Sequence, residues 1–244
     1  MIGYELRDRV AIIEFQRPEA RNALNPEVLA GLIAAFDRAV ADEAFVIVLT
    51  GQGSAFCAGA DLRSGAVLDK GFATDVIDFY VRAEKLDQIV VAALNGPAVG
   101  AGVQMAMMAD LRVLDPSATI AIPAAKLGVT IDKWTLRRLE NLVGGGHARS
   151  ILMAGRKYDA QTLEQLGFAN LIGDRAAALE FARGLTAMAP LSLRNYKALF
   201  KNDYARETVT AAEQARLHAV WDSEDLKEAV MARFERRDPV FRGR

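Results

Sequence analysis

The stretch NGPAVGAGVQMAMMAD, residues 95–110, runs from a glycine-rich loop into a short apolar helix. It follows the run IVVAAL (89–94), which has the length and composition of a buried strand. Small residues let a ligand approach the backbone, and the free N–H groups at a helix start favour an anion or a polarised oxygen. The stretch therefore predicts a loop that holds a ligand. Gln104 stands where an acid or a base is expected to follow the glycines.

A second stretch has the same design. The buried-type strand FVIVLTG (45–51) leads into the loop GQGSAFCAGADL (51–62), which we expect to enter a helix capped by Asp61. Two such loops at the ends of adjacent strands could aim two N–H groups at one oxygen, as an oxyanion hole does. Tight packing explains the same small residues, so spacing alone does not separate the two interpretations.

The rest of the chain predicts an α/β fold. We expect a β-hairpin around Arg7–Asp8–Arg9, a helix from about Pro26, another helix over residues 75–88, and a strand at LRVLD (111–115). Strand, helix and strand in this rhythm indicate right-handed βαβ units and a largely parallel sheet. From about residue 132 the character changes to helical periodicity, and no low-complexity linker separates two domains.

Composition and motifs argue against several classes of protein. The 30 Lys and Arg residues nearly equal the 31 Asp and Glu residues, so no global field attracts nucleic acid or an anionic membrane. A single cysteine, Cys57, permits neither a disulfide nor a Cys-based metal site within the chain. No P-loop, H-E-x-x-H or G-x-S-x-G motif occurs, and only 2 histidines are present, so we expect no metal and no Ser-His-Asp triad.

The N-terminus and the apolar runs bear on where the protein is found. The first residues, MIGYELRDRV, are charged at once and lack the apolar core of a signal peptide. The longest apolar runs are far too short to span a bilayer. We therefore expect a cytoplasmic protein without an integral membrane segment.

Several motifs in order along nearly the whole chain resemble the crotonase superfamily, also called enoyl-CoA hydratases/isomerases. They are RPEARNALN (17–25), VIVLTGQGSAFCAGADL (46–62), ALNGPAVGAGVQMAMMADLRV (93–113) and FERRDPVFR (234–242). The resemblance implies a crotonase-type spiral of ββα units over residues 1–185. It also implies a C-terminal helical region, residues 186–244, that packs on neighbouring subunits in homotrimers, often paired into hexamers. The implied ligand is a thioester of coenzyme A, with no further cofactor.

The resemblance assigns roles to backbone groups in both loops. The first oxyanion donor would be the N–H of Ala60, and the second the N–H of Ala101, where alanine replaces the family's glycine. Because both donors are backbone groups, that replacement need not remove one. Ala58, Asp61 and Leu62 resemble the loop that holds the adenine base.

Further positions match the expected binding site for coenzyme A. Ala23 belongs to this set, and Arg63, Arg21 and Arg236 stand where cations can reach the phosphates of the ligand. Each arginine is equally explained as a solvated surface charge, and electrostatics alone does not distinguish the two interpretations.

The sequence departs from the family at two positions. Hydratases of this family use two glutamates to position and activate a water, and the matching positions are Gln104 and Ala124. A glutamine cannot exchange a proton near neutral pH, and alanine has no titratable group. General acid–base catalysis contributes about 10²–10⁴-fold, so hydration should be crippled. In this respect the chain resembles actinobacterial paralogues that lack both glutamates.

One carboxylate complicates this interpretation. In some branches of the superfamily an aspartate at the position of Asp132 performs the chemistry, so Asp132 could act as a base or a nucleophile. The alternative is that it only caps the helix KWTLRRL (133–139). Its neighbour Trp134 could line an acyl tunnel or simply pack.

Two functional hypotheses follow. In the first, the protein binds fatty acyl-CoA thioesters in fatty acid metabolism, together with other enzymes of that metabolism, and lacks efficient hydratase activity. In the second, it is an active member of the enoyl-CoA hydratase/isomerase family that uses the oxyanion hole and Asp132.

Overall fold

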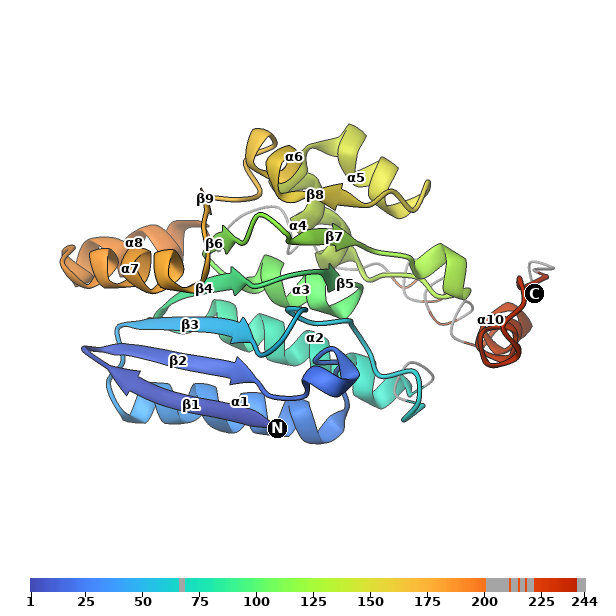
Figure 1. Cartoon of the computed structure of the whole chain (residues 1–244), viewed down its shortest axis with the longest axis horizontal. Coiled ribbons are helices and arrows are strands. Elements are labelled where there is room, and N and C mark those ends of the chain that lie inside the picture. Colours follow the sequence, from blue (N-terminus) through green and yellow to red (C-terminus); the bar gives the residue numbers. More distant parts are fainter. Residues whose placement is uncertain (66–68, 201–210, 212–214, 216–217, 219–221, 241–244) are drawn as a thin grey trace.

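A six-stranded sheet forms the centre of the core (Figure 1). The structure is a computed structural model that describes residues 1–65, 69–200, 211, 215, 218 and 222–240. The strand order is β1-β2-β3-β4-β6-β9, and only β1 and β2 pair in the antiparallel sense. The strands are β1 (Ile2–Arg7), β2 (Val10–Phe15), β3 (Val46–Gly51), β4 (Ile89–Leu94), β6 (Leu111–Leu114) and β9 (Leu171–Ile172).

The predicted N-terminal hairpin is confirmed. β1 pairs with β2 from Ile2 opposite Phe15 to Arg7 opposite Val10. The connecting residues Asp8 and Arg9 have φ values of 46° and 66°, both in the left-handed region. A two-residue turn of this kind matches the right-handed twist of the strands.

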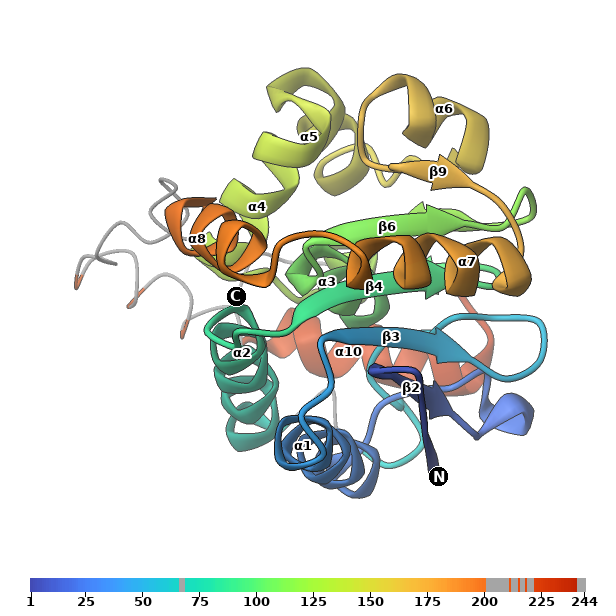
Figure 2. The same cartoon turned by 90° about the vertical axis from the view of Figure 1, so that its left-hand side faces the viewer.

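Both faces of the sheet are buried, which explains the continuous apolar runs in its central strands. In β3, Ile47 and Leu49 join the larger core cluster, whereas Val46 and Val48 join the smaller one. The larger cluster includes residues of α1 (Pro26–Ala41) and α2 (Lys70–Glu84), and the smaller one includes residues of α7 (Arg175–Thr186). Figure 2 shows α7 running beside β4, away from α1 and α2.

A smaller sheet carries the loop that opened the sequence analysis. It consists of β5 (Ala98–Val99), β7 (Thr119–Ala121) and β8 (Tyr158–Asp159). β5 leads directly into α3 (Ala101–Met108), the predicted short apolar helix. The chain then continues through η3 (Ala124–Leu127), α4 (Lys133–Val143), α5 (Gly145–Leu152) and α6 (Ala160–Gln165).

The helix start near Pro26 is confirmed, but the helix expected to begin at Asp61 is not. The side chain of Asn25 accepts the N–H of Val28, and Pro26 occupies the first helical turn of α1. Asp61 instead closes a turn, where its Oδ1 accepts the N–H of Arg63 at 3.0 Å. The next helix, α2, has Asp69 as its N-cap, so it starts earlier than residue 75 and ends at Glu84.

The C-terminal region contains α8 (Pro190–Phe200) and α10 (Glu224–Glu235). Part of the region expected to be helical from about residue 132, residues 207–221, lies largely outside the described residues. α10 packs on η3 at the end of the molecule far from α7 and α8 (Figure 1). Gly128, just after η3, lies so close to α10 that a Cβ atom would come within 2.6 Å of the Asp225 carbonyl oxygen.

Candidate functional site

The two loops singled out by the sequence lie side by side. A short parallel bridge joins Cys57 to Ala98. Cys57 donates its N–H to the Pro97 carbonyl at 3.4 Å, and its own carbonyl accepts the N–H of Val99 at 2.9 Å. The loop after β3 is therefore fastened to the loop after β4.

Glycines make this close approach possible. Gly59 has a φ of 90°, and a Cβ atom there would lie 2.6 Å from the Val99 carbonyl oxygen. At Gly102 a Cβ atom would lie 2.2 Å from the Cys57 carbonyl oxygen. Both distances are shorter than any real contact of a Cβ atom, so a side chain at either position would push the loops apart.

The predicted donors, the N–H groups of Ala60 and Ala101, are both available for a ligand. Leu24 bonds to the residues on either side of Ala60, accepting from the N–H of Asp61 and donating to the carbonyl of Gly59. In such a parallel bridge the N–H of Ala60 itself points away from Leu24. Ala101 is the first residue of α3, so its N–H has no intrahelical acceptor. Neither group donates a hydrogen bond within the described part of the chain.

A cavity of about 1720 Å³ opens beside these two residues. Most of the predicted site residues line it, namely Ala58, Ala60, Leu62, Ala101, Gln104, Asp132, Trp134 and Arg236, together with Ala124. Four predicted residues lie outside its lining: Arg21, Ala23, Asp61 and Arg63. The structure thus brings together the loop residues, the wall of α3 and α4, and the end of α10.

Asp61 and Ala23 are tied together by Arg17, a residue that the sequence analysis missed. The guanidinium of Arg17 donates to the Asp61 carboxylate at 3.1 Å and to the Ala23 carbonyl at 2.8 Å. Asp61 and Ala23 are each only 8% exposed. Arg17 therefore fastens the segment before α1 to the loop that holds Ala60. Arg17 heads the motif RPEARNALN, but its partner Asp61 lies 44 residues away, so no local pattern pairs the two.

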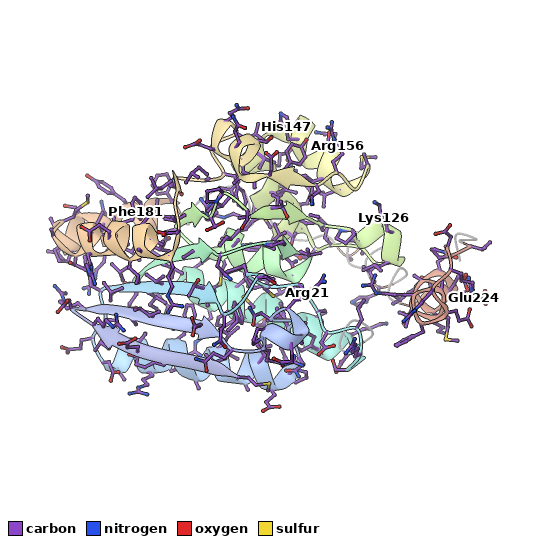
Figure 3. All side chains as sticks on the ribbon, viewed as in Figure 1. Arg21, Lys126, His147, Arg156, Phe181 and Glu224 are labelled. Carbon is purple, nitrogen blue, oxygen red and sulfur yellow. The ribbon has the colours of Figure 1, made fainter. Side chains whose placement is uncertain are left out.

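The predicted cations differ in position. Arg21 and Arg63 are exposed and lie outside the cavity lining, and Arg21 has a left-handed φ of 50°. Arg236, at the end of α10, does line the cavity. Lys126 of η3 lines it as well, and in Figure 3 both Lys126 and Arg21 lie on the side of the core nearest α10.

Trp134 both lines the cavity and packs. Its indole is stacked on Tyr80 of α2, with ring centroids 5.3 Å apart and an interplanar angle of 19°. Its Nε1 donates to the Glu84 carboxylate at 3.1 Å. The neighbouring lining includes Phe72, Val76 and other apolar side chains of α2. This wall is apolar, as the walls of most small-molecule sites are.

Gln104 is held by a polar network that joins α3 to α4. Its Nε2 donates to the Thr135 hydroxyl at 2.5 Å and lies 3.4 Å from the Asp132 Oδ2, within hydrogen-bonding range. Asp132 caps α4 by accepting the N–H of Thr135 at 2.9 Å, and it also accepts the Thr135 hydroxyl at 2.5 Å. Asp132 is therefore the N-cap of α4, and whether it also has a chemical role stays a prediction.

Burial keeps two nearby groups protonated. It raises the pKa of the Cys57 thiol to about 12, although the backbone of Gly59 lowers it in part. It raises the pKa of Tyr80 well above its usual value, and Cys57 and Asp132 add to this effect. Near neutral pH, Cys57 is thus no nucleophile, and Tyr80 remains an O–H donor to the Ala101 carbonyl at 3.2 Å.

The structure offers no metal centre within its described residues, where His, Cys, Asp and Glu side chains form no group able to hold a metal. His147, labelled in Figure 3, instead has its Nδ1 2.9 Å from the Tyr158 hydroxyl. Among the helices of the described part, none is both long and apolar enough to cross a bilayer.

The chain is similar to known proteins over its full length. Residues 5–244 match the family Enoyl-CoA hydratase/isomerase. The chain is 42% identical to the "Probable enoyl-CoA hydratase echA6" of Mycobacterium tuberculosis, and the match covers 100% of both chains. It is 30% identical to the 2,3-dehydroadipyl-CoA hydratase of Escherichia coli, with 98% of this chain and 97% of the relative covered.

A solved structure has the same fold. The crystal structure of an enoyl-CoA hydratase/isomerase from Pseudoalteromonas atlantica superposes with a TM-score of 0.86 at 28% identity, covering 99% of each chain. The predicted crotonase fold is therefore confirmed. The chain belongs to the enoyl-CoA hydratase/isomerase family, within the crotonase superfamily.

Proposed function

We propose that this protein binds fatty acyl-CoA thioesters and does not hydrate them efficiently. The observation that carries the proposal is that one cavity combines available hydrogen-bond donors with missing proton-transfer groups. Two available backbone N–H groups stand at Ala60 and Ala101, while the expected proton-transfer positions hold Gln104 and Ala124. Such a protein would hold, present or sense an acyl thioester in fatty acid metabolism, in company with other enzymes of that metabolism.

The thioester carbonyl would accept hydrogen bonds from Ala60 and Ala101. Backbone donors fixed before the ligand arrives stabilise a polarised oxygen without reorganisation. Gly59 and Gly102 support this role because they hold the two loops in contact. The alanine at position 101 leaves the donor in place.

The size and lining of the cavity support a long ligand with an anionic end. Sites for drug-sized molecules measure about 300–1,000 Å³, and this cavity of about 1720 Å³ is larger. Apolar side chains of α2 and α4 would surround the acyl chain, and Lys126, Arg233 and Arg236 line the same cavity. Cations of this kind suit the phosphates of coenzyme A.

Hydration would be slow because neither expected group can transfer a proton. The amide of Gln104 is engaged with Thr135 and Asp132, and amides do not titrate near neutral pH. Ala124 begins η3 directly after Pro123 and contributes only a methyl group. Without general acid–base groups, the rate should fall by about 10²–10⁴-fold.

A second candidate function rests on the position of Asp132. It lines the same cavity as Ala60 and Ala101, so it is a candidate acid or base for isomerisation of a bound enoyl thioester. Its two carboxylate oxygens already accept from Thr135, which supports a holding role rather than proton transfer.

The two functions are separated by incubating the protein with enoyl-CoA thioesters of several chain lengths and following the absorbance of the conjugated thioester. We expect no hydration near ordinary enzyme rates. Rapid hydration would contradict the first function. Isomerisation that disappears in Asp132→Asn would support the second function, and isomerisation that persists would exclude Asp132 as the base.

We also propose that the C-terminal helices assemble the chain into trimers or into hexamers made of two trimers. Exposed apolar side chains on α8 and α10 support this: Leu191, Phe200, Met231 and Phe234. Each of the two helices carries two of these side chains, and exposed apolar patches mark interaction surfaces. Light scattering coupled to size-exclusion chromatography measures the mass directly, and a monomer at micromolar concentration would contradict assembly.

A further inference from the structure

The contacts of Gln104 are directional, and together they require an amide at this position. An ionised carboxylate only accepts hydrogen bonds, so the Thr135 hydroxyl must donate its single proton to Asp132 at 2.5 Å. The Thr135 oxygen can then only accept from Gln104, at 2.5 Å. The side chain at position 104 must therefore present a donor to Thr135.

Two further contacts agree with this direction. The Asp132 Oδ2 lies 3.4 Å from the same Gln104 nitrogen. On the other side, the hydroxyl of Tyr80 lies 3.5 Å from the Gln104 Oε1 and 3.2 Å from the Ala101 carbonyl oxygen. The nitrogen of the amide thus faces α4 and its oxygen faces α2, an orientation fixed by the network around it.

The core encloses one side of the network, whereas Gln104 and Asp132 are partly buried and also line the cavity. Thr135 and Tyr80 are both 0% exposed, and Trp134 covers Tyr80 as a stacked ring. A polar group in such a place is costly unless it is fully paired. A glutamate at position 104 would point a second acceptor-only oxygen at Thr135 and Asp132, neither of which has a proton left to donate to it.

We propose that Asp132 is a positioning residue which, through Thr135, holds the amide of Gln104 against α4 and makes the wall beside Ala101 specific for an amide at position 104. The inference rests on the proposed function only in treating the cavity wall beside Ala101 as part of the thioester site. It predicts that a glutamate alone cannot restore the missing catalytic position, because Asp132 must be neutralised at the same time.

The first test is the dependence of thermal stability on pH in Gln104→Glu, measured without ligand. Two carboxylates in contact cannot both ionise freely, so one of them should keep its proton to a higher pH in the folded state than in the unfolded chain. The folded state then binds more protons, and stability should fall as pH rises from about 5 to about 8. Each unit of pKa difference corresponds to a thermal midpoint lower by about 3–5 °C relative to the wild type.

The other groups near the pair do not produce this slope. Tyr80 of α2 and the Cys57 thiol beside it both stay protonated in this range. His218 and the α4 residues Lys133, Arg137 and Glu140 line the same cavity and are present in every variant compared. Differences from the wild type at each pH therefore report on the new carboxylate.

The control exchanges the amide and the carboxylate between positions 104 and 132. In the double variant Gln104→Glu/Asp132→Asn, the asparagine still caps α4 and its amide donates to the new glutamate, while Thr135 donates to that glutamate as well. We expect this double variant to recover the wild-type dependence on pH. Asp132→Asn alone keeps the cap and tests the loss of the charge.

The outcomes are separate from those of the acyl-CoA experiments, because no ligand is present. A wild-type profile in Gln104→Glu, or an unchanged slope in the double variant, would overturn the proposal. If Gln104→Glu does not fold while the double variant does, the proposal is supported in a stronger form. Failure of both variants to fold would overturn it, since the reversed pair satisfies every contact.

A second readout, the rate of hydration, connects the residues at positions 104 and 132 to catalysis. Gln104→Glu/Ala124→Glu should gain little hydration of crotonyl-CoA, and adding Asp132→Asn to it should raise the rate by at least tenfold. Equal rates in the double and triple variants would contradict the role given to Asp132.

Discussion

At the scale of single residues, the site depends on glycines more than on reactive side chains. The proposed donors of Ala60 and Ala101 are backbone groups, so the residue types at these positions matter less than the distance between the loops. That distance is limited by Gly59 and Gly102, where a Cβ atom would collide with a neighbouring backbone.

Gly102→Ala should therefore damage both stability and binding. Its methyl group would lie 2.2 Å from the Cys57 carbonyl oxygen, and relief requires movement of the backbone. Overpacking of this kind costs about 1–3 kcal/mol or more. We expect a lower thermal midpoint and a loss of at least tenfold in acyl-CoA affinity by calorimetry.

Gly146→Ala is the matched control for this change. Gly146 lies in the first turn of α5, and a Cβ atom there meets nothing within 4 Å. Alanine favours a helix by up to about 1 kcal/mol over glycine. Unchanged binding in Gly102→Ala would show that the contact between the loops does not shape the site.

Cys57 offers a chemical measure of the same contact. Burial raises the pKa of its thiol to about 12, against an ordinary value near 8.5. At pH 8 a thiol reagent should label no cysteine in the native protein and one in denaturant. Rapid labelling of the native protein would contradict the burial.

The same shift predicts a dependence of stability on pH. Between about 8.5 and about 12 the unfolded chain has lost the thiol proton while the folded chain retains it. The folded state then binds more protons, so stability falls as pH rises through this window. Cys57→Ala should remove that part of the slope in urea denaturation.

At the scale of elements, α8 is anchored to the core by one buried ion pair. The Lys197 ammonium donates to the Asp110 carboxylate at 2.7 Å and to the Gln88 carbonyl at 2.6 Å. The lysine side chain is only 4% exposed, and Asp110 also accepts the N–H of Val90 at 2.8 Å. The first helix of the predicted C-terminal region is thus fixed to its own chain's sheet.

Lys197→Met should lower the free energy of unfolding by about 3 kcal/mol. Removing one partner of a buried pair costs about 3–5 kcal/mol, and the 25% exposure of Asp110 places the cost at the lower end. Urea denaturation measures this change. Arg183→Ala, which removes an exposed pair with Glu180 at 3.5 Å, should cost less than about 1 kcal/mol. Equal losses in both variants would contradict the anchoring role.

At the scale of the whole molecule, the sequence predicted the elements that have a strong apolar pattern. The hairpin, α1, β3, β4 and α3 were recognised because each combines an apolar pattern with a clear turn or cap. The short strands β7, β8 and β9 were missed, since 2 or 3 residues carry no period to detect. These strands form because the strands beside them supply their hydrogen-bond partners.

The candidate site was predictable where it follows one continuous motif. The loops around Ala60 and Ala101 and the departures at Gln104 and Ala124 could be read directly from the sequence. The role of Arg17 could not, because its partner Asp61 lies 44 residues away in sequence. The network of Gln104, Thr135 and Asp132 likewise depends on the packing of α3 against α4, which no local pattern encodes.

Titration of a long-chain 2-enoyl-CoA thioester into the protein by calorimetry tests the central claim most directly, because one trace records both binding and turnover. We expect heats that saturate at one ligand per chain, with the signal returning to the baseline after each injection. A sustained heat that scales with protein concentration would reveal efficient turnover and contradict the claim. The absence of any heat up to high micromolar ligand, at two temperatures, would contradict binding itself.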